Sequence, residues 1–127
     1  MNIDFIHDHL LVQSGGGVLI QTGGKIQSGK IVNIPQGSGA SSACQSTNSC
    51  FIPSSITVNS GVTIIWKNQD SVAHTVTSGN PTAGPDGEFD SGLFGQGHTF
   101  SHTFNSPGTF DYYDQVHPWQ IGKVIVS

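Results

Sequence analysis

Charged side chains are scarce in this chain of 127 residues, because Lys, Arg, Asp and Glu together number only 12. An average domain would carry about a quarter of its residues as charged types. The formal net charge of −4 provides no basic stripe, which argues against a nucleic-acid-binding protein. No apolar run approaches the roughly 20 residues of a membrane-spanning helix. The short run from Leu10 to Val12 is likewise too small for the apolar centre of a secretory signal, so an exported protein would have its leader outside this chain.

Cysteine is nearly absent as well. The two cysteines, Cys44 and Cys50, enclose a short polar stretch rich in turn-forming residues. The residues alone allow a disulfide-closed loop, worth roughly 2 kcal/mol in the chain-entropy model, or two free thiols in a reducing compartment.

Short β-rich runs fill most of the remaining chain, with turn signals about every ten residues and no helical period. This pattern predicts one all-β domain, a sandwich or a barrel. We expect a loop over 80–87, which holds two prolines and two glycines. The expected strands are 31–35, 56–58, 62–67, 74–78, 99–104, 109–113 and 122–127.

The first 30 residues form a separate feature. Met1 to Ser14 has a weak pattern, and we expect a frayed or loosely docked terminus rather than a second metal site built on His7, Asp8 and His9. Residues 18–21 and 26–32 flank Gly23-Gly24 and predict a β-hairpin. An isolated hairpin is barely stable, so it must extend the sandwich or dock on another subunit as a homo-oligomer contact.

Potential metal ligands gather in the segment from Tyr112 to Gly122. Asp114 and His117 are three residues apart, and Gln120 follows three residues later. His74 lies forty residues upstream of Asp114, next to a predicted strand. A compact loop together with one distant histidine is a common way to build a mononuclear metal site on a β-sandwich.

This combination resembles the cupredoxins, the plastocyanin-like copper proteins, whose copper loop reads Tyr-x-Cys-x-x-His-Pro-x-Met and is followed by Gly and a last strand. The matching residues are Tyr112, Tyr113, His117, Pro118, Gly122 and the strand 123–126, together with Trp66, Asn68, Asp70, His74, Thr75 and Val76 around the first histidine. Phe89 to Gly92 and Thr99 to Phe104 also match runs of the plastocyanin-like branch. The resemblance covers 31–127, leaving 1–30 as an extension. It implies a Greek-key β-sandwich with one copper per chain.

Two positions depart from the family pattern. Asp114 occupies the cysteine position, and Gln120 occupies the position of the axial methionine. A blue copper site owes its colour to a copper–thiolate bond. We therefore expect His74, His117 and Asp114 to form a type 2-like site, with Gln120 either coordinating or lining an open axial position. The substitution is either natural or an introduced Cys→Asp replacement.

The resemblance also implies neighbours of the metal. Asn68 and Thr75 are expected to tether the ligand loops by hydrogen bonds, and Trp119 to shield the site at the surface. His98 is expected near the metal end of the sandwich. There it is an exposed loop residue, a hydrogen-bond partner or a fifth ligand. His102 shares a face with two phenylalanines, so we expect it to be packed and not a ligand.

The functional hypotheses follow from this site. The first is an electron-transfer copper protein that is exported, meets a redox partner protein and has Cys44 joined to Cys50 under oxidising conditions. The second is a solvent-open copper enzyme acting on a small molecule such as nitric oxide or nitrite. The third is a copper-binding module without turnover.

Overall fold

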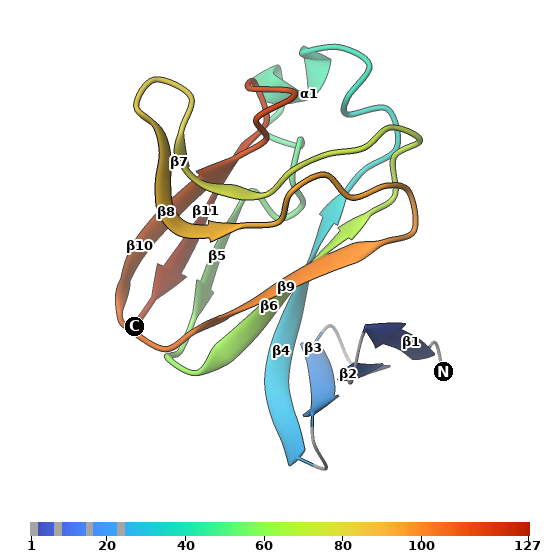
Figure 1. Ribbon diagram of the computed structural model, residues 1–127, viewed down its shortest axis with the longest axis vertical. Coiled ribbons are helices and arrows are strands. Elements are labelled where there is room, and N and C mark those ends of the chain that lie inside the picture. The colour runs from blue at the N-terminus through green and yellow to red at the C-terminus, as the bar shows by residue number, and fades with distance from the viewer. Residues whose placement is uncertain (1–2, 7–8, 15–16, 23–24) are drawn as a thin grey trace.

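Two β-sheets face each other in the computed structural model, which describes residues 3–6, 9–14, 17–22 and 25–127, with side chains from residue 29 onward (Figure 1). The predicted all-β sandwich is therefore confirmed. The first sheet has the order β1 (Ile3–Ile6), β2 (His9–Ser14), β3 (Gly17–Thr22), β4 (Lys25–Ile34), β6 (Val62–Asn68), β9 (Thr99–Phe104). The second has the order β5 (Ser55–Val58), β11 (Ile121–Val126), β10 (Gly108–Tyr113), β7 (Thr77–Asn80), β8 (Gly84–Asp90).

The chain crosses repeatedly between the sheets, as in a Greek key: β6 leads to β7 in the other sheet, β8 leads back to β9, and β9 leads again to β10. Aromatic side chains fill the space between the sheets. Trp66 is fully buried at the centre and packs against Phe89, Phe100, Phe104 and Tyr112. Rings of this size bury large apolar areas, so this cluster supplies much of the hydrophobic stabilisation.

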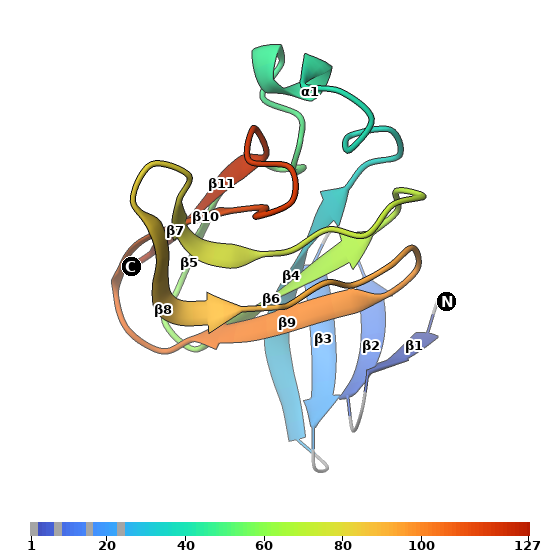
Figure 2. The same cartoon turned by 45° about the horizontal axis from the view of Figure 1, so that its top comes forward.

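The N-terminal strands continue the first sheet beyond the sandwich (Figure 2). The predicted hairpin is confirmed, because β3 pairs antiparallel with β4 on either side of residues 23–24, which lie outside the described residues. The expectation of a frayed terminus is wrong, since β1 and β2 pair with each other and β2 pairs with β3. Of the proposed His7–Asp8–His9 site, residues 7–8 and the side chain of His9 lie outside the described part. The division at residue 30 falls within β4, which pairs with β6 from Gly29 onward.

The loop expected over 80–87 is also wrong in its second half, where β8 begins at Gly84 and pairs with β7. Pro85 is compatible with this strand because β8 is the outermost strand of its sheet, and an edge strand tolerates a residue without an N–H group. A break in the register between Thr77 and Gly79 accommodates the irregular pairing.

Three connections meet at one end of the sandwich: the β10–β11 loop, the segment from β6 to β7, and the segment from β4 to β5 (Figure 1). The last of these contains the short helix α1 (Ala43–Ser46) and the disulfide between Cys44 and Cys50, which confirms the expected pairing. No helix in the described part of the chain has the length and apolar character needed to cross a membrane.

Gly122 and Tyr112 are cross-strand partners in β11 and β10 just below this end. The Tyr112 ring lies across Gly122 so closely that a methyl group at position 122 would overlap its outer ring atoms. Tyr112 is 1% exposed and contacts Phe51 and Trp66, so the ring has little room to move. Glycine at position 122 is therefore required for the packing of the strand that leads into the loop.

Replacing Gly122 with alanine should lower the free energy of unfolding by about 1–3 kcal/mol, because the added methyl group displaces the buried Tyr112 ring. The matched control is Gly95→Ala, where the added carbon would meet only His98 Cδ2 at 4.0 Å. Urea unfolding of both variants measures the difference, and equal midpoints for the two would contradict this account of the packing.

Candidate metal centre

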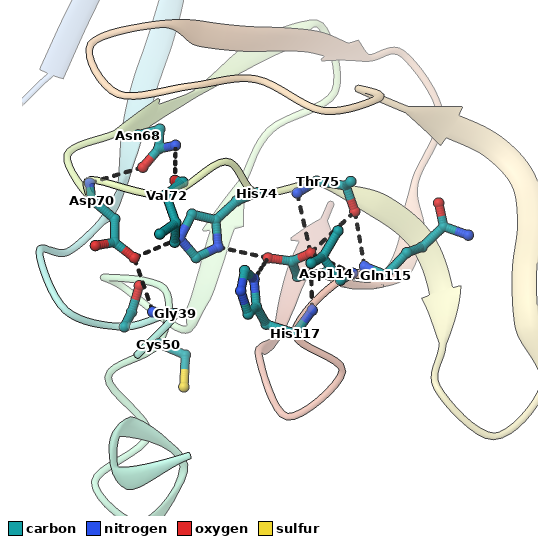
Figure 3. A network of polar contacts seen from close by, with 12 residues as sticks. Gly39, Cys50, Asn68, Asp70, Val72, His74, Thr75, Asp114, Gln115 and His117 are labelled. Atoms are coloured by element: carbon teal, nitrogen blue, oxygen red, sulfur yellow. Dashed lines mark hydrogen bonds and ion pairs between the residues drawn. The ribbon is translucent and has the colours of Figure 1, made fainter. Parts of the chain in front are cut away.

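His74, Asp114 and His117 converge at the end of the sandwich where the connections meet (Figure 3). His74 comes from the segment between β6 and β7, and the other two come from the β10–β11 loop. One oxygen of the carboxylate, Asp114 Oδ2, lies 2.6 Å from His74 Nδ1 and 2.9 Å from His117 Nδ1. His74 and Asp114 are fully buried, and the side chain of His117 is 12% exposed. The structure thus brings together three of the four residues that the sequence analysis named as candidate ligands.

The two oxygens of Asp114 have different roles. Oδ1 accepts backbone N–H groups of Val116 at 2.8 Å, Thr75 at 3.2 Å and His117 at 3.3 Å, and the Thr75 hydroxyl lies 3.5 Å away. Oδ2 is left to the two imidazoles. The backbone therefore fixes the carboxylate through one oxygen and presents the other to both histidines, which suits a monodentate metal ligand.

His74 is held from both sides, because its second nitrogen, Nε2, lies 2.8 Å from Asp70 Oδ2. Burial alone would lower the pKa of His74, but the two carboxylates outweigh burial and raise it. A carboxylate on the far nitrogen of a histidine is a frequent device for fixing the ring toward a metal. The sequence analysis assigned no role to Asp70, although its separation of four residues from His74 was a usable signal.

Asp70 also fastens the segment between β4 and β5 over the site. Gly37 N donates to Asp70 Oδ1 and Gly39 N donates to Asp70 Oδ2, each at 2.9 Å. Burial would raise the pKa of Asp70, but these donors, His74 and Ser71 lower it to about 2. A carbon added at Gly39 would lie 3.1 Å from His117 Nε2, so Gly39 lies close to the outer nitrogen of that ring.

Gln120 lies fully buried at the end of the same loop. Its backbone N–H donates to His117 O at 2.8 Å, but its amide nitrogen and oxygen find no hydrogen-bond partner among the described residues. Leaving a buried amide unpaired costs about 1–3 kcal/mol, and such groups usually have a partner. The amide of Gln120, buried and unpartnered three residues after His117, is therefore available to coordinate a metal ion.

The residues expected around the ligands are in contact with them or with their loops. Asn68 Nδ2 donates to Val72 O and Phe94 O, and Asn68 Oδ1 accepts from Asp70 N, which orders the turn that leads to His74. The Thr75 hydroxyl accepts from Gln115 N at 2.9 Å and joins the two ligand segments.

The aromatic neighbours and the remaining histidines are also located. Trp119 meets the His117 ring edge-on, with ring centroids 5.3 Å apart, and its indole N–H donates to Ser38 O. His98 is exposed on the rim, where its carbonyl accepts from Asn68 N. His102 packs between Phe89 and Phe104 as expected, and burial lowers its pKa.

The spacing of the donor atoms fits a single metal ion. Two donors bound at right angles, each about 2.0 Å from a metal, lie about 2.8 Å apart, close to both distances measured from Asp114 Oδ2. All three donor atoms lie within 4.8 Å of one another. Burial would raise the pKa of Asp114, but hydrogen bonds from His74 and His117 lower it, so the carboxylate is charged. Two imidazoles, a carboxylate and an amide oxygen are ligands that Cu(II) accepts.

Sequence comparison finds a matching protein family and two related proteins. A family model described as copper-binding proteins of the plastocyanin/azurin family matches residues 40–127. Amicyanin from Paracoccus versutus is 30% identical over 77 residues, which are 61% of this chain and 58% of that protein. Amicyanin-alpha from Methylorubrum extorquens is 32% identical over 74 residues, which are 57% of this chain and 60% of that protein. The matched region thus spans less than two thirds of either relative.

Solved structures agree with the sequence comparison. A purple cupredoxin from Nitrosopumilus maritimus has a TM-score of 0.65 and 29% identity, covering 76% of this chain and 98% of that one. Amicyanin from Paracoccus versutus has a TM-score of 0.56 at 24% identity, covering 76% and 79%, and shares the fold. Because the family model matches more than half of the chain, and includes Asp114, His117 and Gln120 as well as His74, the protein belongs to the copper-binding plastocyanin/azurin family.

Proposed function

We propose that this chain is an electron-transfer cupredoxin with an altered copper site. One copper per chain would be held by His74 Nδ1, His117 Nδ1 and Asp114 Oδ2, with Gln120 Oε1 as the fourth donor. The observation that carries the proposal is the convergence of both imidazole Nδ1 atoms on one buried carboxylate oxygen at 2.6 and 2.9 Å. The unpartnered amide of Gln120 supports the fourth position.

Bound copper would supply one-electron chemistry, and the residues of this chain would hold its ligands in place. Asp70 keeps His74 in position through Nε2, and the backbone N–H groups on Asp114 Oδ1 keep Oδ2 directed at the histidines. In the metal-free protein the donor atoms share protons, so copper binding should release protons. Electron transfer is faster when the ligand geometry changes little between the two oxidation states. The hydrogen bonds that hold His74 and Asp114 would limit such a change.

The surroundings of the site favour exchange of electrons with a redox partner protein over chemistry on a bound substrate. Three of the four proposed ligands are fully buried, and the fourth, His117, is only 12% exposed and has Gly39 close to its outer nitrogen. The disulfide fits an extracytoplasmic location, because such bonds persist in oxidising compartments.

The proposal also includes a contact between copies of the chain through the N-terminal hairpin, which light scattering on the intact protein tests.

Copper binding should require both histidines. His74→Ala and His117→Ala should each weaken Cu(II) binding by at least about tenfold, since each removes one strong donor. Isothermal titration or chelator competition measures the dissociation constant. The matched control is His102→Ala, which removes a half-buried histidine away from the site and should leave the dissociation constant unchanged. Equal affinity in all three variants and the original protein would rule out this ligand set.

The identity of residue 114 should determine the visible absorption and the electron paramagnetic resonance spectrum of the copper-loaded protein. A carboxylate oxygen mixes weakly with copper, so the copper-loaded protein should be pale, with the wide hyperfine splitting of type 2 copper in electron paramagnetic resonance. Asp114→Cys should create an intense thiolate-to-copper absorption band in the visible range. Removing His117 from that variant should abolish the band. A colourless Asp114→Cys protein that still binds one copper would show that position 114 does not face the metal.

The alternative function, a solvent-open copper enzyme acting on nitric oxide or nitrite, predicts a different response to small anions. A closed site should give the same electron paramagnetic resonance spectrum with and without azide or nitrite. A spectrum that shifts and saturates with anion concentration would replace the electron-transfer proposal with the enzymatic one. A copper-loaded protein that neither shifts with anions nor undergoes reversible reduction would instead be a binding module without turnover.

A further inference from the structure

Two buried hydroxyl groups lie behind the carboxylate of Asp114. Thr75 and Thr77 are two residues apart on an extended segment, so their side chains point to the same face. Their Oγ1 atoms are 3.0 Å apart, and the residues are 4% and 0% exposed. Thr75 Oγ1 lies 3.5 Å from Asp114 Oδ1. The pair therefore connects the candidate ligand with the interior of the second sheet.

Thr77 extends this connection to the surface. Its hydroxyl can donate to Asp90 Oδ1 at 3.1 Å or to Gln115 Oε1 at 3.3 Å. Asp90 is exposed at the end of β8, and the same oxygen accepts from Gly92 N at 3.0 Å. A continuous series of polar contacts thus runs from Asp114 through Thr75 and Thr77 to a charged carboxylate on an edge strand.

The direction of each hydrogen bond in this series depends on where the hydroxyl protons of Thr75 and Thr77 point. Each threonine hydroxyl has a single proton to donate and two lone pairs to accept. Thr75 already accepts from Gln115 N, so its proton can go to Thr77 or to Asp114 Oδ1. A hydrogen bond to an ionised acceptor is roughly twice as strong as a neutral one, so Asp90 draws the proton of Thr77 toward the surface. Thr77 is then free to accept the proton of Thr75. Asp114 Oδ1 is also an ionised acceptor, but it lies 3.5 Å from Thr75 Oγ1, at the limit of a hydrogen bond, whereas Thr77 Oγ1 lies at 3.0 Å. The shorter distance therefore favours Thr77 as the acceptor.

The charge on the carboxylate of Asp114 depends on which acceptor the Thr75 hydroxyl donates to. When the proton of Thr75 points to Thr77, Oδ1 is left with its backbone donors, and the negative charge on the carboxylate is less neutralised. When that proton points to Oδ1, a further hydrogen bond withdraws charge from the carboxylate and pulls it toward Thr75. The first arrangement gives a stronger donor to a metal at Oδ2.

We infer that Thr77 and Asp90 are remote positioning residues for Asp114: by directing the hydroxyl of Thr75 away from Oδ1, they set the orientation and donor strength of the carboxylate that would bind copper. The inference rests on the proposed function, because it concerns the same ligand. Neither residue touches the metal position, and neither was assigned a role by the sequence motif.

Thr77→Val is the direct test, because valine keeps the branched shape and removes the hydroxyl. In the intact chain loaded with Cu(II) alone, this variant should bind copper about tenfold more weakly, a typical effect for a residue that orients a ligand. The copper hyperfine splitting should also change, since the oxygen donor is altered. Thr77→Ser restores the hydroxyl and should return both quantities to their original values.

The chain offers a matched control. Thr63 and Thr103 form a similar hydroxyl pair, 2.7 Å apart, between β6 and β9 in the other sheet. Thr103→Val therefore breaks the same kind of contact without connection to Asp114, and should leave affinity and spectrum unchanged. Asp90→Asn, at an exposed position, should shift the spectrum in the same direction as Thr77→Val. The double variant should be no weaker than Thr77→Val alone, because both act through one contact.

The outcomes separate the inference from the proposed function. If the unaltered protein binds copper and Thr77→Val gives the same affinity and spectrum as Thr103→Val, the inference is overturned while the copper site stands. If Thr77→Val fails to fold, Asp90→Asn decides alone, and an unchanged spectrum overturns the inference. If the unaltered protein binds no copper, the proposed function fails. The amide nitrogen shift of Gln115 in the metal-free protein then decides: a shift in Thr77→Val but not in Thr103→Val supports the contact, and no shift overturns it.

Discussion

The carboxylate of Asp114 is the interaction on which this end of the molecule depends. Its Oδ2 contacts one imidazole from each of two chain segments, and its Oδ1 accepts backbone N–H groups from those same segments. A single side chain therefore joins the β10–β11 loop to the segment before β7. These polar contacts directly connect the two segments at the candidate site.

Burying ionised side chains is unfavourable unless each one is paired and hydrogen-bonded. Here Asp70, His74 and Asp114 are almost fully buried, yet each charged atom has partners, and the pKa values of both carboxyl groups are lowered despite burial. A cysteine thiolate at position 114 would carry the same single negative charge. In the proposed copper site, the carboxylate would therefore keep the charge of a thiolate while replacing a soft donor with a hard one, which would change the redox chemistry and leave the electrostatics of the loops nearly intact.

Local patterns and the resemblance to the cupredoxins were sufficient to predict most of the fold and to name the four candidate ligands. Alternating residues and turn signals predicted the sandwich, and the resemblance of the segments around His74 and His117 to the cupredoxin motif implied that both lie near Asp114. The strand at Gly84 was missed because Pro85 is acceptable only on an edge, and a strand's place in a sheet depends on the whole topology. The proximity of Gly39 to His117 was missed for the same reason, since the two are brought together from distant parts of the chain and glycine has no side chain to indicate a role.

The segment between β4 and β5 is held at this end of the sandwich by a disulfide and by backbone hydrogen bonds to a buried carboxylate. The disulfide closes its second half, and Asp70 holds its first half through Gly37 and Gly39. Because Asp70 Oδ2 also contacts His74, the covering segment and a candidate ligand share one carboxylate. Displacing the cover would remove hydrogen bonds that keep Asp70 ionised, and would weaken its hold on His74. Access to the proposed copper site and the orientation of His74 would therefore be coupled through Asp70, because one carboxylate holds both the covering segment and the imidazole.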